Sequence, residues 1–207
     1  MTNGLDQLAL RLAPAQVAQL LGFVSLLAKW NKTYNLTAVR EPEQMVTAHL
    51  LDCLAAVAPL GSPGRILDVG TGAGLPGIPL AIARPEWRVT MIDAVAKKVA
   101  FVQQAIGLLK LPNARVEHGR VESYKSDGPF DVVISRAFAE LNDFSHAALD
   151  QAAPQGTLVA MKGVYPHDEL GRLPANVVVD RVVPLRIPGT DAQRHLVFLR
   201  AAAKLES

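Results

Sequence analysis

The sequence predicts a doubly wound α/β fold, in which helices cover both faces of one seven-stranded, Rossmann-like sheet. Short apolar runs alternate with helical stretches from Arg65 onward, a pattern typical of a parallel sheet that is buried on both sides. One of these runs ends directly in a glycine-rich turn that opens a helix. The 207 residues suffice for one such domain with a short extension.

Residues 1–60 are expected to form a helical extension that packs on the core, so that the chain is one structural domain overall. Apolar residues recur at helical spacing over 14–30, which predicts an amphipathic helix, and a loop is expected over 30–39. Pro42 suits the first turn of a second helix, which should run to about Ala58. Basic and acidic residues are equally frequent in this extension, so it is not a basic arm.

Residues 61–207 are expected to form the core. The predicted strands span 65–69, 88–92, 114–118, 131–135, 157–162, 177–183 and 195–200. The helices between them are expected to begin near Leu75, Ala96 and Leu141, with a shorter helix near His167. Seven strands of this length fit one doubly wound sheet.

Composition excludes several classes of site. Cys53 is the only cysteine, so an internal disulfide and a zinc site built on paired thiolates are excluded, and the scattered histidines suggest no metal ligand set. No apolar run approaches the roughly 20 residues that cross a bilayer, and the first residues lack a secretory signal pattern, so we expect a cytoplasmic protein without a membrane partner. The net charge of +2 is compatible with nucleic acid but does not decide the matter.

The strongest functional signal lies in the segment 66–74, where a buried strand pattern runs into a glycine turn before a helix. Gly70, Gly72 and Gly74 allow a positive φ or a close approach of the backbone to a ligand, because a Cβ would collide there. Asp93 ends the next predicted strand, where its carboxylate can accept hydrogen bonds from both ribose hydroxyls of an adenosine. These residues predict a nucleoside pocket at the carboxyl edge of the sheet.

The spacing of the glycines distinguishes two classes of cofactor. A dinucleotide fingerprint requires glycine at the position of Leu75, whereas the G-x-G-x-G spacing favours S-adenosylmethionine. That ligand has no pyrophosphate, and Pro76, expected in the first helical turn, removes one N–H donor that a phosphate would use. Asp68 is then a candidate partner for the methionine ammonium, directly or through water. A glycine turn without a ligand is the alternative interpretation.

Two residues after the third predicted strand are candidates for binding the adenine. Glu122 can accept a hydrogen bond from the exocyclic amine, and Val121 can pack on the ring. A solvated glutamate in a loop is an equal alternative.

Several sequence blocks carry a more specific resemblance. They are Trp30-Asn31-Lys32-Thr33-Tyr34-Asn35-Leu36-Thr37, residues 68–79, Ser135-Arg136-Ala137-Phe138, Met161-Lys162-Gly163 and Arg194-His195-Leu196-Val197. In these blocks and their order, over nearly the whole chain, the sequence resembles the bacterial small-subunit rRNA methyltransferases of the glucose-inhibited division B family.

That resemblance implies methylation of N7 of a guanine in 16S rRNA, with free 16S rRNA or the small ribosomal subunit as partner. It implies a doubly wound methyltransferase sheet with an amino-terminal helical part. It also implies that the S-adenosylmethionine pocket is lined by Gly70, Leu75, Val121, Glu122 and Arg136. We expect the chain to act as a monomer.

The expected chemistry needs no general base, because guanine N7 offers a lone pair without a proton to remove. We therefore expect positioning to dominate and name no acid or base residue. Methylation at pyrimidine C5 needs a thiolate nucleophile near the methyl donor, and Cys53 lies in the amino-terminal helical extension, so this class is not expected. Ser135-Arg136-Ala137-Phe138 is not the Asn-Pro-Pro-aromatic turn that binds an exocyclic amine, whereas Lys162 leaves attack by a ribose hydroxyl open.

Six residues are the main candidates for contact with RNA, and all but Asn35 have a structural alternative. Arg136, at a strand end, can pair with the cofactor carboxylate or bind the target base, and otherwise is a surface arginine. Lys162 is expected to bind phosphate or else extend to solvent. Arg194 and His195 are expected to contact RNA or form an edge-strand charge pair. The remaining candidates are Asn35 and His49, which can cover the pocket with Asp52; His49 and Asp52 can instead bond each other. Phe138 can stack on an extruded base or pack in the core.

Three functions remain open from the residues alone: an rRNA methyltransferase, a small-molecule or protein methyltransferase, and a nucleotide-binding module without catalysis. The first two share a pocket and differ in the surface around it. A cluster of Arg136, Lys162 and Arg194 around one cleft would favour RNA.

Overall fold

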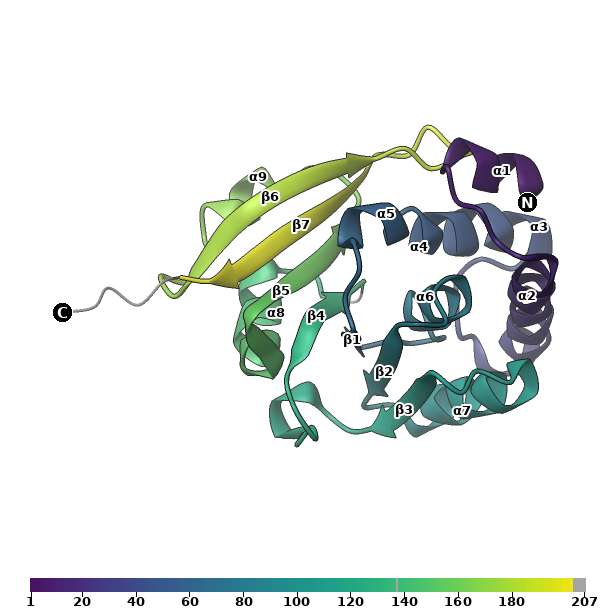
Figure 1. Cartoon of the computed structure of the whole chain (residues 1–207), viewed down its shortest axis with the longest axis horizontal. Coiled ribbons are helices and arrows are strands. Elements are labelled where there is room, and N and C mark those ends of the chain that lie inside the picture. The colour runs from purple at the N-terminus through teal and green to yellow at the C-terminus, as the bar shows by residue number, and fades with distance from the viewer. Residues whose placement is uncertain (137, 203–207) are drawn as a thin grey trace.

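The computed structural model describes residues 1–136 and 138–202. Its strands form one seven-stranded sheet in the order β3-β2-β1-β4-β5-β7-β6, which confirms the predicted doubly wound fold (Figure 1). The strands are β1 (Arg65–Val69), β2 (Arg88–Asp93), β3 (Ala114–His118), β4 (Phe130–Ser135), β5 (Ala152–Lys162), β6 (Val177–Leu185) and β7 (Arg194–Ala201).

The sheet is not wholly parallel, which corrects the prediction. β7 pairs antiparallel with both β5 and β6, so it runs against the other strands of the described sheet. The cause lies in the connection, because residues 186–193 join β6 to β7 without a helix, and a parallel pairing needs a longer crossover. β6 therefore forms the edge, and β7, which carries Arg194 and His195, lies inside the sheet.

Helices cover both faces of the sheet. α2 (Pro14–Tyr34), α6 (Gly77–Ala83) and α7 (Ala96–Leu109) share one hydrophobic cluster with Ile66 of β1. α8 (Leu141–Ala148) packs in a second cluster with Leu67, the next residue of the same strand. Consecutive strand residues point to opposite faces, so these two clusters are the two layers of the core. Short elements complete this part: η2 (Val121–Ser123), η3 (Leu149–Gln151) and α9 (His167–Leu170).

The amino-terminal extension is more helical than predicted. α1 (Thr2–Gln7) was not predicted, and it lies beside the loop between β6 and β7, where Met1 and Leu8 pack against Ile187 (Figure 1). α2 continues through the first part of the predicted loop and ends at Tyr34, followed by Asn35 in the left-handed conformation with φ 49°.

The second predicted helix has the expected start and extent but is not regular. It consists of α3 (Pro42–Met45), a π-helical turn η1 (Val46–Leu51), α4 (Asp52–Leu54) and α5 (Val57–Leu60). π turns inside helices occur frequently at functional sites.

Most other boundaries are close to the predicted ones. α7, α8 and α9 begin where they were predicted, whereas β5 starts at Ala152 rather than Thr157. α6 begins at Gly77, so Pro76 precedes the helix rather than lying in its first turn. Among the described residues, no helix is long and apolar enough to cross a membrane.

Candidate active site

The carboxyl ends of four neighbouring strands meet at one edge of the sheet. Val69, the last residue of β1, pairs with Ile92 of β2, and Asp93 pairs with His118 at the end of β3. Ser135 ends β4 on the other side of β1, where its hydroxyl donates to the carbonyl of Val69 at 2.7 Å. The chain leaves β1 toward β2, and β4 lies on the opposite side, so this is the switch point at which open α/β sheets bind ligands.

The glycine turn after β1 has the backbone that the sequence predicts. Gly70, Gly72 and Gly74 have φ values of 66°, 59° and 77°. A Cβ on Gly72 would meet only the carbonyl oxygen of Gly70, at 3.9 Å, so this part of the turn is open to a ligand. A Cβ on Gly74 would lie 2.6 Å from Cγ1 of Ile78, so that glycine serves the packing of α6.

Asp93 connects the two turns that follow β1 and β2. Its Oδ2 accepts a hydrogen bond from the Gly72 N–H at 2.8 Å, and its Oδ1 accepts one from the Val95 N–H at 2.9 Å. The Lys98 amine lies 3.9 Å from Oδ2. An ionised carboxylate has about four lone-pair sites, so each oxygen can still accept a ribose hydroxyl.

A cavity of about 310 Å³ lies at this edge. It brings together four of the residues predicted to bind the cofactor, from segments far apart in the sequence: Gly70, Asp93, Val121 and Glu122. Phe138 also lines it, with its ring 5.3 Å from that of Phe144. The other predicted cofactor residues are not on its wall; Leu75 is buried in the core beneath the turn.

Two cationic residues of the cavity wall were missed at the sequence level. Lys98 lies in the first turn of α7, directly after the Asp93 loop, and Arg120 follows Gly119 after β3. The sequence did contain a signal for both, because residues that directly follow the strands of a parallel sheet lie at the same edge, where ligands bind.

Asp68 is a buried carboxylate with one unpaired oxygen. Its Oδ2 accepts hydrogen bonds from the Thr71 hydroxyl at 2.6 Å and the Gly77 N–H at 2.8 Å. Its Oδ1 has no hydrogen-bond partner within the described part of the chain. Burial raises the pKa of this carboxyl to about 6, although the two hydrogen bonds and the charge of Arg136 oppose the shift. A buried acceptor without a partner fits a site for a cationic group such as the ammonium of S-adenosylmethionine.

Arg136 is held at the end of β4 by a carboxylate from the amino-terminal extension. Oδ2 of Asp52 lies 3.2 Å from Nη1 of Arg136, and Oδ1 lies 2.7 Å from Nε of Arg194. Two of the predicted RNA contacts therefore meet at one buried acid.

His49 does not bond Asp52, which makes that alternative wrong. The His49 ring pairs with the Thr37 hydroxyl at 2.8 Å and with the Ala48 carbonyl at 2.9 Å. The side chain is buried, and burial together with the charge of Arg136 lowers the pKa of His49. The imidazole of His49 fixes the loop after α2, and the burial of this side chain contradicts its predicted contact with RNA.

Lys162 does not extend into the cleft or to solvent, contrary to both sequence-based expectations. Its amine donates to the carbonyl of Ala139 at 2.5 Å and to Glu169 Oε2 at 2.7 Å, and its side chain is only 10% exposed. The same Glu169 oxygen accepts the Leu141 N–H at 2.8 Å. Lys162 thus fixes the chain at Ala139, directly before α8. Ala137, within the matched block, lies outside the described residues.

Asn35 and His195 both keep part of their surface open to solvent. Oδ1 of Asn35 accepts a hydrogen bond from Arg40 at 3.1 Å, and Asn35 is exposed. Nδ1 of His195 lies 2.8 Å from the Gly163 carbonyl oxygen. Their contact with RNA remains a prediction.

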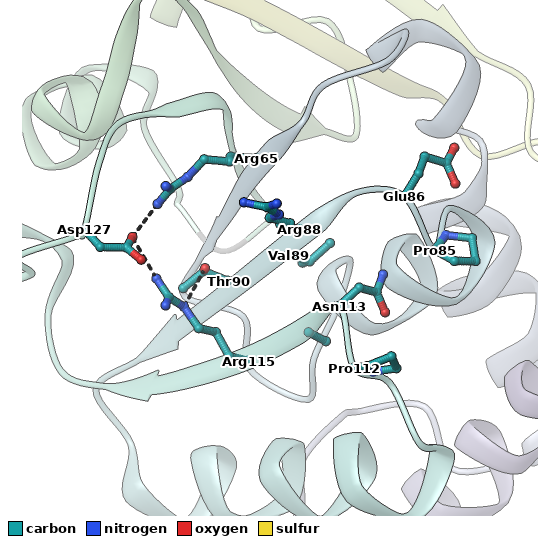
Figure 2. Close-up of a pocket in the computed structure, with 11 residues that line it drawn as sticks. Arg65, Pro85, Glu86, Arg88, Val89, Thr90, Pro112, Asn113, Arg115 and Asp127 are labelled. Carbon is teal, nitrogen blue, oxygen red and sulfur yellow. Dashed lines mark hydrogen bonds and ion pairs between the residues drawn. The ribbon is translucent and has the colours of Figure 1, made fainter.

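A larger cavity, of about 420 Å³, lies at the opposite edge of the sheet, at the amino ends of β1, β2 and β3. Figure 2 shows Arg65 and Arg115 pointing toward Asp127, which binds them at 2.5 Å and 3.2 Å. Ligands of open α/β sheets bind at the carboxyl edge, so size alone does not make this cavity the active site.

Residues 1–136 and 138–202 contain no group of three or more His, Cys, Asp or Glu side chains that could hold a metal ion. Cys53 is buried, and burial raises the pKa of its thiol above the ordinary value. The thiol is therefore unsuited to act as a nucleophile.

Solved structures with the same fold include two methyltransferases. A SAM-dependent methyltransferase from Aquifex aeolicus superposes with a TM-score of 0.59 at 21% identity, over 77% of this chain and 93% of its own. The O-methyltransferase TomG from Streptomyces achromogenes, in complex with SAM, gives a TM-score of 0.57 at 16% identity, over 93% and 92% of the two chains. At these identities the likeness concerns the fold.

Sequence relatives are far more similar. A ribosomal RNA small subunit methyltransferase G from Acidovorax sp. (strain JS42) is 50% identical over 216 residues, covering 98% of this chain and 95% of its own. The protein of the same name from Chromobacterium violaceum is 49% identical over 197 residues, covering 95% and 94%. The sequence model of the GidB family, rRNA small subunit methyltransferase G, matches residues 16–197. With its fold, its glycine turn and these matches, the chain belongs to the rRNA small subunit methyltransferase G family.

Proposed function

We propose that this chain transfers the methyl group of S-adenosylmethionine to N7 of a guanine in 16S rRNA. The observation that carries the proposal is the carboxyl edge of the sheet, where Gly70 of the glycine turn and Asp93 line a cavity of about 310 Å³ and where Asp68, close to the end of β1, has one buried oxygen without a partner among the described residues. Membership of the rRNA small subunit methyltransferase G family supports the rRNA substrate.

Four polar residues at this edge have a counterpart on the proposed cofactor. Asp93 accepts from the ribose hydroxyls, and Glu122 accepts from the adenine amine while Val121 packs on the ring. Oδ1 of Asp68 pairs with the methionine ammonium, and Arg136 pairs with the methionine carboxylate. Opposite charges thus meet at both ends of the amino-acid moiety.

Bound S-adenosylmethionine supplies an electrophilic methyl group on a sulfonium. The protein then has to hold guanine N7 on the axis behind that methyl group and exclude water, and such positioning can account for about 7 to 11 kcal/mol of barrier. No residue has to remove a proton, because N7 carries none. We infer that the chain acts in the cytoplasm as a monomer on 16S rRNA, free or in the small subunit.

Transfer of a labelled methyl group tests this function. The protein is incubated with labelled S-adenosylmethionine and small ribosomal subunits that lack the modification, and the labelled nucleotide is mapped. We expect label at N7 of one guanine of 16S rRNA, and no uptake by fully methylated subunits. Label in protein or in a small molecule only, or cofactor binding without transfer, would contradict the proposal.

A further inference from the structure

The carboxylate of Asp52 binds two arginines, which come from the ends of two different strands of the sheet. Oδ2 lies 3.2 Å from Nη1 of Arg136, directly after β4, and Oδ1 lies 2.7 Å from Nε of Arg194, the first residue of β7. The Asp52 side chain is 6% exposed, against 27% for Arg136 and 35% for Arg194. The acid is therefore buried beneath two cations that keep part of their surface open.

The π-helical turn explains why Asp52 faces these arginines. In a regular α-helix, residues i and i+3 share a face, so His49 and Asp52 would be neighbours. η1 contains more residues per turn and separates them. His49 consequently turns to Thr37, whereas Asp52 turns toward the carboxyl ends of β4 and β5.

A second acid of this chain shows what is special about Asp52. Asp127 also binds two arginines, Arg65 and Arg115, at the opposite edge of the sheet (Figure 2). Its side chain is 63% exposed. Exposed ion pairs contribute little and move freely, whereas removal of one partner from a buried pair leaves a charge without compensation. Of these two acids, only Asp52 is buried where it binds its arginines.

We propose that Asp52 is a positioning residue, which fixes the guanidinium of Arg136 for the cofactor carboxylate and ties it to Arg194 on the RNA side. Taken together, two arginines and one carboxylate carry a net positive charge, which suits an anionic group of either substrate. Because the carboxylate is shared, a shift of Arg194 on RNA binding is transmitted to Arg136 through a single side chain. This role rests on the function proposed above, since it requires Arg136 to bind the cofactor.

A double-mutant cycle separates positioning from a general structural role. Asp52→Asn keeps the shape of the side chain but leaves one acceptor oxygen for two arginines. We expect it to weaken S-adenosylmethionine binding about tenfold in calorimetry. In an Arg136→Ala background the same substitution should have no further effect on the dissociation constant, because the group that Asp52 positions is gone. Losses that add in the double variant, or a wild-type affinity of Asp52→Asn, would overturn the proposal.

Matched controls keep the result interpretable. Asp127→Asn, which also removes a carboxylate between two arginines, should bind the cofactor like the wild type. Thermal unfolding is measured for every variant, and if Asp52→Asn does not fold, the cycle is run with Asp52→Glu, which keeps the charge. If the wild type binds the cofactor and methylates rRNA but the losses in the cycle are additive, the role of Asp52 is rejected and the proposed function stands. Absence of cofactor binding by the wild type would reject the proposed function itself.

Discussion

The amide N–H of Gly72 donates a hydrogen bond to Oδ2 of Asp93 at 2.8 Å. The carboxylate assigned to the cofactor ribose therefore also shapes the glycine turn that faces the cofactor. A substitution of Asp93 should therefore disturb the conformation of the glycine turn and the ribose contact at the same time.

The first prediction concerns this shared carboxylate. Asp93→Ala removes the acceptor of the Gly72 and Val95 N–H groups together with the ribose contact, so we expect at least about tenfold weaker S-adenosylmethionine binding in calorimetry. Asp131→Ala is the matched control, because Asp131 accepts two backbone N–H groups, of Gly64 and Arg65, at the opposite edge. Equal affinities of both variants would count against the ribose assignment.

The second prediction distinguishes two glycines of the turn. Alanine in the left-handed region costs roughly 1–2 kcal/mol at either position. At Gly74 the new Cβ would also lie 2.6 Å from Cγ1 of the fully buried Ile78, whereas at Gly72 it meets nothing closer than 3.9 Å. Gly74→Ala should therefore lower the free energy of unfolding in urea by about 1–3 kcal/mol more than Gly72→Ala. Equal losses would show that the packing beneath the turn is not as described.

The third prediction is a pH dependence of cofactor binding. Burial raises the pKa of Asp68 to about 6, and only its ionised form can pair with the methionine ammonium. Cofactor affinity should then be constant well above pH 6 and fall as pH drops through about 6. Asp68→Asn should bind weakly at every pH and lose this dependence. A wild-type profile that is flat from pH 5 to 8 in calorimetry would contradict the pairing.

The same group affects the stability of the ligand-free protein with the opposite sign. When folding raises the pKa of an acid, the protonated form of that acid favours the folded state over the unfolded state. The contribution of Asp68 is thus complete below its ordinary pKa of 3.8 and is lost as pH rises through about 6. The difference in free energy of unfolding between wild type and Asp68→Asn, measured in urea at several pH values, should change over this window.

The fourth prediction concerns Lys162. Its amine is bound to Ala139 and Glu169 and largely buried, so Lys162→Met should cost about 2 kcal/mol of unfolding free energy, because the Glu169 carboxylate loses its cationic partner. Lys125→Met, at an exposed lysine, should be neutral. If instead Lys162→Met were stable and lowered the salt dependence of RNA binding, the amine would be a phosphate contact after all.

The fold could be predicted from the sequence because its signals are local. Buried strands such as 65–69 and 88–92 have continuous apolar runs, and the glycine turn marks the ligand edge without any knowledge of contacts. The reversal of β7 was missed because strand direction depends on the connection, and the π-helical turn was missed because helical periodicity hardly changes over one turn.

The candidate site could be predicted where the backbone alone determines position. Gly70, Asp93, Val121 and Glu122 each follow or end a strand, and all four line the cavity. The directions of long side chains could not be predicted, because they depend on partners distant in sequence. Lys162 turns back to Glu169, and Arg136 and Arg194 converge on Asp52, which belongs to another part of the chain.

The central claim is that the carboxyl edge of β1 and β2 binds S-adenosylmethionine, and a crystal structure of the protein with this ligand tests it most directly. We expect the adenosine in the cavity lined by Gly70, Asp93, Val121 and Glu122, with the methionine ammonium at Oδ1 of Asp68. Density for the ligand at the opposite edge, among Arg65, Arg88 and Arg115, or an empty carboxyl edge at saturating ligand, would contradict it.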